Sequence, residues 1–555
     1  MREIASTADV PLRPPAQVMR LARMGSMHQS RLSFMRILLR RMKAEGWRIE
    51  RPRFEIDAHG VGTALYRAVT PTRSYTLVAF GHDLPDEKRS DRVIADAWDA
   101  TFALFDGAPT DADVEQLRAN VPLQEAGRTS ERVLTLSRAN RSVRLFGHVI
   151  EALAAGHQPE AQKVAEVGYL MRTTAVYGSG KFGNADREVI ADRPEMAAPF
   201  QAEMLTVYLI RCFVLDLVEH MARARSASAV PLEPSLRRRF GIGNSTGLGM
   251  APFLIHHPAL INNWMAAREE ALARVRSVET ASAEEIAVYQ DRLARAIRSA
   301  DDWNSAHPLQ IEKLAALRPD LDRVVGRSLA ARRPWDDLYQ WAEAALSLEG
   351  QEALLSLMLE AYPDLVDGLA DCMSADEAQF RRIDGAATCG AILSLLGEFY
   401  GWADGIDWDA PQADARAWYV SAEKLEPRLG ERHEEPIAKY EQPLSPARDA
   451  ALLGEILSNF PAEAPIAEFL LQHPEHRHMV RRLQLLDRCP YGEVRDNTIA
   501  HDMLPIDLLR CKLSFFGAGH FDPRSDRWVR INMFQGAPFP HEIAETGDDW
   551  VYPSW

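Results

Sequence analysis

Residues 196–225 read MAAPFQAEMLTVYLIRCFVLDLVEHMARAR, and this stretch decides the expected fold. Its apolar run predicts one long helix over Met196–Arg225. Cys212 lies within that run and is interpreted as a small buried hydrophobic side chain. Two glycine-rich segments flank the helix along the chain, Tyr177–Glu188 before it and Arg239–Met250 after it. We therefore expect a helical body with two unusual bends beside its longest helix.

Helical patterns dominate the chain from about residue 110 onward. No fixed-period repeat relates them, so a solenoid is not expected. The further predicted helices are Glu131–Ala155, Gln162–Val176, Asn263–Val278, Ala283–Ala300, Leu309–Leu329, Trp335–Leu348, Gln351–Met373, Ala387–Trp402, Ala413–Leu425, Pro446–Asn459, Ala464–His473 and Glu475–Asp487.

The N-terminal region has a different pattern. Trp47–Ile56, Val61–Val69 and Ser74–Phe80 are short strand-like runs separated by turn residues. The short gaps favour an antiparallel meander of three strands. A helix over Lys88–Phe105 is expected to cover one face of this meander, because three strands alone bury too little surface.

An amphipathic helix with a basic face is predicted over His28–Glu45. Such a helix can contact membranes or nucleic acid, but the acidic balance of the chain favours a helix that covers an acidic neighbour within the protein. Near the C-terminus, Leu513–Phe516 and Trp528–Met533 are predicted as the strands of a short hairpin. Phe534–Trp555 follows as a tail rich in proline and aromatic residues.

The predicted fold class is mainly α: a multi-helical body with a small N-terminal α+β unit of about three antiparallel strands and a short C-terminal β-hairpin. The expected divisions are a loose arm over 1–27, the α+β unit over 28–108, a main helical body over 109–403, a second helical part over 404–511, and the hairpin with its tail over 512–555.

Composition limits the class of protein. The chain has 555 residues, a hydrophobic fraction of 46% and a formal net charge of −15. The acidic balance argues against general nucleic-acid binding, which requires a basic face. Five scattered cysteines suit a reducing compartment better than a disulfide framework. No membrane-length apolar run and no secretion signal are found, so we expect a cytoplasmic protein that contacts no membrane.

The first glycine-rich segment carries groups that suit chemistry on an anion. Lys181, Asn184 and Arg187 are predicted to bind substrate, and Ser179 or Tyr177 to move a proton. The segment is not a P-loop, because GxxxxGK[ST] is absent, Phe182 follows the lysine, and a helix is expected before it. The alternative is a helix C-cap followed by an ordinary polar turn.

The second glycine-rich segment is the stronger candidate for an anion site. Its glycines space the triplet Asn244, Ser245 and Thr246, whose amides and hydroxyls would face an anion. Arg239 would supply the counter-charge, and His256 would act as a general acid or base. The spacing does not match a dinucleotide fingerprint, and no strand is expected before it. The alternative is close packing of two helices around small residues.

Arg138 and Arg141 complete the predicted binding set. They are expected near one face of the Glu131–Ala155 helix, where they would hold a carboxylate, although solvated surface arginines are the commoner explanation. The segment His473–His478 resembles half of a di-iron motif, but the second copy is missing, so a solvent-facing helix start explains it better.

These residues predict a soluble enzyme that acts on a small carboxylate- or phosphate-bearing metabolite by proton transfer, in the manner of a lyase or a hydrolase. No cofactor is assigned, and a homo-oligomer is compatible with the sequence. One alternative is a non-catalytic helical binding or assembly protein. Another is a helical enzyme that depends on a metal or haem.

Overall fold

The fold is organised around α8 (Gln201–Arg225), which is buried along nearly its whole length. The computed structural model describes residues 9–88, 97–120, 130–178, 192–244, 258–305, 307–373, 382–408, 446–495, 504–525, 528–548 and 550–552. A helix that is apolar on all sides must be covered on all sides. The helix predicted over Met196–Arg225 is confirmed over Gln201–Arg225, and Met196 belongs to the short η3 (Pro194–Met196) before it.

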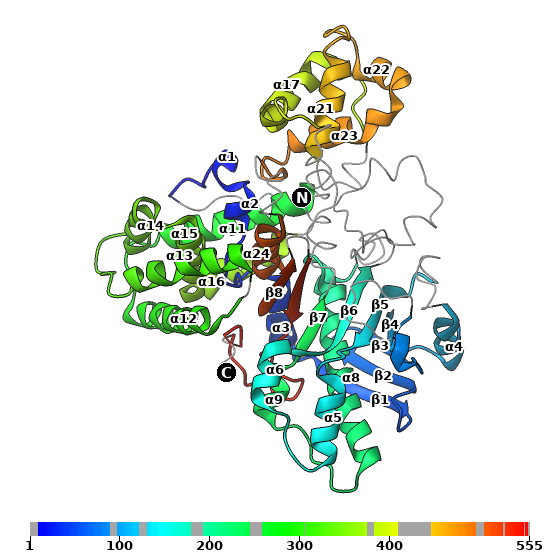
Figure 1. Ribbon diagram of the computed structural model, residues 1–555. Coiled ribbons are helices and arrows are strands. Elements are labelled where there is room, and N and C mark those ends of the chain that lie inside the picture. Colours follow the sequence, from blue (N-terminus) through cyan, green and yellow to red (C-terminus); the bar gives the residue numbers. More distant parts are fainter. Residues whose placement is uncertain are drawn as a thin grey trace.

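A mixed, curled sheet lies against α8 (Figure 1). Its strands follow the order β1-β2-β3-β4-β5-β6-β7-β9-β8, and neighbouring strands are antiparallel except for the parallel pair β6 and β7. The strands are β1 (Arg48–Ile56), β2 (Gly62–Val69), β3 (Ser74–Gly81), β4 (Ala100–Asp106), β5 (Val133–Arg141), β6 (Tyr169–Gly178), β7 (Gly241–Asn244), β8 (His520–Ser525) and β9 (Trp528–Met533).

The two faces of the sheet are covered differently. The strands from β2 to β7 all contact α8, and we call this side the α8 face. On the opposite side, α4 (Asp111–Asn120) packs Val114 and Leu117 against Phe80 and Phe105 of the sheet, and we call this the α4 face. Side chains alternate between these faces along the regular parts of each strand, and register shifts interrupt the alternation in five of the described strand pairs.

Helices build the rest of the molecule in two groups. One group packs into the same core as the α8 face, and the other, made by α17 and α21 to α23, has a separate apolar core. The first group comprises α11 (Pro258–Arg276), α12 (Ala283–Asp302), α13 (Pro308–Val324), α14 (Pro334–Ala345), α15 (Leu348–Met358), η4 (Leu359–Ala361), α16 (Pro363–Val366) and η5 (Asp367–Cys372). The second comprises α17 (Cys389–Tyr400), η7 (Gly401–Ala403), α21 (Pro446–Leu457), α22 (Ile466–Gln472), η8 (Pro474–His476) and α23 (Arg477–Leu486).

The remaining described elements connect these parts. Near the N-terminus are α1 (Pro15–Val18), α2 (Leu21–Met24) and α3 (Phe34–Ala44); between strands lie η1 (Asp86–Lys88), α5 (Phe146–Ala154), α6 (Ala161–Val167), η3 (Pro194–Met196) and α9 (Pro234–Arg239); and α24 (Leu504–Phe516) precedes β8. None of the described helices combines the length and apolar character that crossing a membrane requires.

The predicted fold class is wrong. The three N-terminal strands exist as expected, in an antiparallel meander, but they are one part of a much larger sheet. The C-terminal strands are not an isolated hairpin, because β9 pairs with β7 inside that same sheet. The residues predicted as a strand at Leu513–Phe516 belong to helix α24 instead.

Three predicted helices contain strands. Strand β4 (Ala100–Asp106) overlaps the C-terminal end of the helix predicted over Lys88–Phe105. Strand β5 (Val133–Arg141) overlaps the N-terminal end of the helix predicted over Glu131–Ala155. Strand β6 (Tyr169–Gly178) overlaps the C-terminal end of the helix predicted over Gln162–Val176. Strands buried on both faces lose the alternation of apolar and polar residues, so periodicity does not separate them from buried helices. The glycine at position 168 was a sequence signal for the end of a helix. In the structure, Gly168 has a φ of 69° and ends α6 just before β6 begins.

Candidate functional site

Both glycine-rich segments leave the sheet from the carboxyl ends of its parallel strands. Residues 179–188 of the first segment follow Gly178 at the end of β6, and residues 245–250 of the second follow Asn244 at the end of β7. The register pairs Asn244 with Thr173, five residues before Gly178. At about 3.3 Å per residue, the two exits are offset by roughly 16 Å along neighbouring strands. They open toward the same edge of the sheet.

Most of the predicted catalytic and binding residues lie outside the described residues. In the first segment these are Ser179, Lys181, Asn184 and Arg187, and in the second they are Ser245, Thr246 and His256. Their assignments stay predictions. Tyr177 lies within β6 and pairs with Leu136 of β5, which places its backbone at the sheet edge where the first segment begins.

The surroundings of these segments differ from the sequence expectation. A strand, not a helix, precedes the first segment, and β6, α8 and β7 form a parallel strand-helix-strand crossover. The exclusion of a P-loop still holds on the residues alone, because the required GxxxxGK[ST] order is absent. The parallel pair creates the kind of strand ends at which open sheets commonly bind ligands.

Close packing explains two of the glycines in the second segment. Gly241 and Gly243 are residues of β7. A Cβ at Gly243 would lie 2.7–2.9 Å from ring atoms of Tyr169, and a Cβ at Gly241 would lie 2.6 Å from the carbonyl oxygen of Met533. These two glycines therefore let neighbouring groups approach the strand, and they do not by themselves indicate a ligand.

Arg138 and Arg141 lie on opposite faces of the sheet, because β5 replaces the predicted helix. Arg138 pairs with Thr101 on the α4 face, and its guanidinium stacks on Trp98 at 3.9 Å. Arg141 lies on the α8 side, where its Nη2 donates to the carbonyl of His59 and its Nε is 3.5 Å from Asp99. The two arginines cannot hold one carboxylate together.

A buried polar cluster occupies the α4 face beside the end of β7. Arg138, Asn140 and Arg172 are 4%, 5% and 6% exposed. Arg172 pairs with Asn140 on one side and Gly243 on the other, so the row runs from β5 through β6 to β7. We call Arg138, Asn140, Arg172, Thr101 and His82 the α4-face cluster.

The cluster holds its side chains in defined orientations. Asn140 accepts a hydrogen bond from the Asp99 amide at 3.0 Å and donates to the carbonyl of Ala97 at 3.2 Å. His82 Nε2 is 2.8 Å from the hydroxyl oxygen of Thr101. Burial lowers the pKa of His82, and Arg118 lowers it further, so the imidazole is neutral at neutral pH. The sequence pattern did not single out Arg172 and Asn140, because only the strand register makes them neighbours.

The two remaining predicted residues are separated by the length of β7. Asn244 is fully buried at the carboxyl end of β7, where it pairs with Thr173 of β6 and Ile531 of β9. Arg239 ends α9 before the amino end of β7, and its carbonyl accepts a hydrogen bond from Gln535. The structure therefore does not bring Arg239 to the edge where β6 and β7 end.

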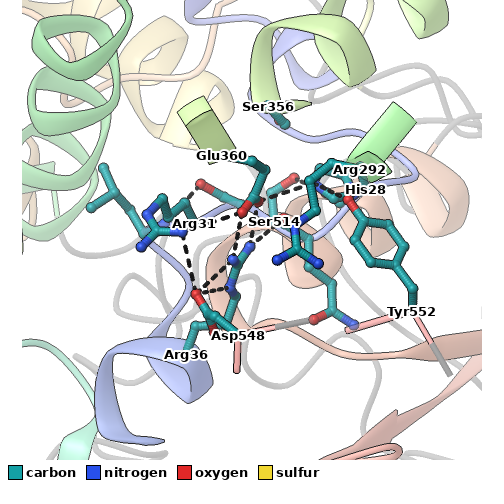
Figure 2. Close-up of polar contacts among 12 residues, drawn as sticks. His28, Arg31, Arg36, Arg292, Ser356, Glu360, Ser514, Asp548 and Tyr552 are labelled. Atoms are coloured by element: carbon teal, nitrogen blue, oxygen red, sulfur yellow. Dashed lines mark hydrogen bonds and ion pairs between the residues drawn. The ribbon is translucent and has the colours of Figure 1, made fainter. Parts of the chain in front are cut away.

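A second polar centre lies between the N-terminal segment, η4 and the C-terminal tail (Figure 2). Arg36 forms a bidentate pair with Glu360, with distances of 2.6 and 2.7 Å, and Arg31 forms another with Asp367 at 2.7 Å for both contacts. Asp548 of the tail also pairs with Arg36. The prediction that the basic helix covers acidic neighbours within the protein is confirmed.

His28 joins this centre to the tail. Its Nε2 is 3.4 Å from Glu360, and its ring stacks on Tyr552 with the ring centroids 5.3 Å apart. Burial lowers the pKa of His28, which outweighs the opposing effect of Glu360. Burial acts to raise the pKa of Glu360, but Arg36 and Arg31 hold it well below its ordinary value. The centre thus contains a neutral imidazole beside an ionised carboxylate.

A small cavity of about 30 Å³ adjoins this centre. Its polar lining includes His28, Gln29, Ser299 and Tyr552. The Gln29 side-chain oxygen is buried and has no hydrogen-bond partner among the described residues. Since one water needs about 10–15 Å³ on this measure, the cavity has room for two or three waters.

The described residues contain no group of three or more His, Cys, Asp and Glu side chains arranged to hold a metal ion. In the region of the half motif, Glu475 is 3.5 Å from His473 and 3.9 Å from His476.

No family model, no curated protein and no solved structure matches this chain.

Proposed function

We propose that this protein is an enzyme that binds a small carboxylate- or phosphate-bearing molecule at the carboxyl ends of β6 and β7 and transfers a proton on it. The observation that carries the proposal is the shared sheet edge at which β6 and β7 end and after which residues 179–188 and 245–250 follow. Ligands of open sheets commonly bind outside the carboxyl ends of parallel strands, where backbone amides are available to anions.

The α4-face cluster contains the positive charges that would bind the anionic ligand. Arg138 and Arg172 are both more than nine-tenths buried, on strands that adjoin the exits of the two segments. Guanidinium groups in a water-poor setting bind carboxylates and phosphates strongly and with defined geometry. Lys181 remains the predicted partner of these arginines, whereas Asn244 pairs with Thr173 and so faces the α8 side.

His82 is the described group best suited to accept a proton. It is neutral at neutral pH, and the hydroxyl of Thr101 holds its ring by a hydrogen bond. Thr101 pairs directly with Arg138 across β4 and β5, so the base and the cation lie on the same face. Ser179, Tyr177 and His256 remain the alternative proton-transfer groups proposed from the sequence.

A ligand screen tests the binding step. Small carboxylates and phosphates are screened by thermal shift, and hits are titrated by calorimetry. A ligand at 100 times its Kd stabilises a native protein by about 2.7 kcal/mol. Arg172→Lys and Arg138→Lys keep the charge but lose the guanidinium geometry, so each should weaken binding about tenfold or more. Arg332→Lys is the matched control, because that side chain is 81% exposed.

Proton transfer is tested on the bound ligand in D2O. We expect NMR to show deuterium entering a carbon-bound position, or product forming, and His82→Gln to slow this at least tenfold. A panel without any stabilising ligand, or affinities equal in all three variants, would remove the α4-face cluster from the proposal. Binding without exchange or turnover would leave a binding protein and contradict the enzymatic part.

A further inference from the structure

Three arginines converge on one oxygen of the C-terminal tail. The Oδ2 atom of Asp548 is 2.7 Å from Arg36 Nη2, 3.0 Å from Arg40 Nη1 and 3.5 Å from Arg31 Nη1. Arg36 Nε adds a fourth contact at 3.2 Å. Arg36 is fully buried, and Arg31 has a side-chain exposure of 8%. We call Arg31, Arg36 and Arg40 the arginine cluster.

A single carboxylate fills this cluster incompletely. All of the arginine contacts of Asp548 go to Oδ2, while Oδ1 is buried and has no hydrogen-bond partner among the described residues. A carboxylate oxygen that is buried without a donor is costly. An oxyanion with three or four oxygens offers acceptors in more directions, which suits several converging guanidinium groups better.

The tail supplies the charge that balances the cluster. Arg31, Arg36 and Arg40 face Glu360, Asp367 and Asp548, so three cations meet three carboxylates only while Asp548 is in place. Arg292 adds positive charge nearby, because it acts electrostatically on both His28 and Tyr552. Its Nη1 is buried and has no hydrogen-bond partner in the described part of the chain, and its carboxylate neighbour Asp291 is 3.7 Å away. Figure 2 shows Arg292 on the His28 side of the same centre.

The cavity described above lies on the His28 side of the same centre, and none of the three arginines lines it. His28 and Tyr552, which belong to this centre, both line the cavity of about 30 Å³. Ala296 lines it too and lies one helical turn beyond Arg292 on α12, so both residues point to the same side of that helix. Room for two or three waters therefore exists on the His28 side of the centre.

We propose that the arginine cluster is a binding site for a compact oxyanion, such as inorganic phosphate or sulfate, and that Asp548 occupies it as an internal competitor. An external anion displaces the Asp548 carboxylate from Arg36 and Arg40 and loosens residues 546–552 from the body. The site is distinct from the strand ends, because its residues come from the N-terminal segment, α3 and the tail.

Calorimetric titration with sodium phosphate tests the competition. Asp548→Asn removes the internal anion while keeping its shape, so it should bind phosphate about tenfold or more tightly than the wild type, whose site is mostly occupied. Glu545→Gln is the matched control: it removes one charge from an exposed residue of the same tail and should bind as the wild type does. Sodium chloride at equal ionic strength should give no heat of binding.

A further substitution locates the site. Arg40 is the most exposed member of the cluster, with a side-chain exposure of 19%, so Arg40→Gln is the least disruptive change. In the Asp548→Asn background it should abolish the gain in phosphate affinity, whereas Arg172→Lys in that background should not. Equal phosphate affinity of Asp548→Asn and wild type, or a gain that survives Arg40→Gln, would overturn the proposal.

Hydrogen exchange on the wild type gives a test that does not depend on a folded variant. Phosphate should increase deuterium uptake in a peptide that spans residues 540–552, and chloride at the same ionic strength should not. Unchanged uptake at phosphate concentrations up to 50-fold above the Kd measured for the Asp548→Asn variant, or up to about 0.1 M phosphate if that variant does not fold, would show that Asp548 is a fixed structural partner. Acetate, sulfate and phosphate in parallel separate a general carboxylate effect from an oxyanion effect.

Discussion

Arg36 and Glu360 form a bidentate ion pair between side chains that are 0% and 1% exposed, and it joins α3 to η4 across 324 residues of sequence. Taking two charges out of water is costly, so their geometry and the surrounding hydrogen bonds decide whether the pair stabilises the fold. Breaking it from one side leaves an uncompensated buried charge.

Glu360→Gln is therefore expected to reduce the free energy of unfolding by about 3–5 kcal/mol. The exposed pair of Arg332 and Glu279 is the comparison, with side-chain exposures of 81% and 45%. Glu279→Gln should cost at most about 1 kcal/mol. Urea unfolding of the two variants measures both, and similar losses would contradict the difference in burial.

Acidification is expected to destabilise the protein through His28. Its pKa is lowered in the folded state by burial, so below about pH 6.5 the unfolded chain binds a proton that the native protein does not. Stability should therefore fall as the pH drops from 7 toward 5. His28→Gln should make this decline shallower than in the wild type. An equal or steeper slope in denaturant titrations across that range would contradict the assignment.

Two glycine substitutions should have opposite signs. Gly243→Ala places a methyl group within 2.7–2.9 Å of the Tyr169 ring and should cost about 1–3 kcal/mol. Gly397, inside α17, has nothing within 4 Å of an added Cβ. Gly397→Ala should stabilise by about 0.5–1 kcal/mol, since glycine is unfavourable in a helix interior. Thermal and urea unfolding test the pair, and a neutral Gly243→Ala would remove close packing as the reason for that glycine.

The second apolar core is expected to depend on Phe469 and not on Leu471. Both residues lie on α22, but Phe469 is fully buried and Leu471 is 86% exposed. Phe469→Ala should cost about 3–5 kcal/mol of the stability of this core. Leu471→Ala should change stability by no more than about 0.5 kcal/mol. Hydrogen exchange in residues 446–486 separates a local loss from a global one.

The opposite faces of Arg138 and Arg141 give a functional contrast. Once a ligand is identified, Arg138→Lys should weaken its binding, whereas Arg141→Lys should not, because Arg141 lies on the α8 side near Asp99. Calorimetric titration of the two variants measures this difference. Equal weakening by both would move the site away from the α4 face.

The local sequence identified the elements whose pattern is complete within one segment. The helix over Met196–Arg225, the meander over residues 47–80 and the basic face of the helix beginning near His28 could all be predicted, because each depends on periodicity or charge within one stretch. The position of both glycine-rich segments beside that long helix was also visible in the sequence.

Only the tertiary structure made strands of β4, β5 and β6, whose residues had a helical pattern in the sequence. Residues 133–140 of β5 and 169–173 of β6 are buried on both faces, so burial removed the alternation that marks a strand, and pairing partners far along the chain determined their conformation. That change separates Arg138 from Arg141 and brings Arg172 beside Asn140 and Gly243. It also places Asp548 among arginines more than 500 residues away, a neighbourhood that no local pattern encodes because long-range packing alone creates it.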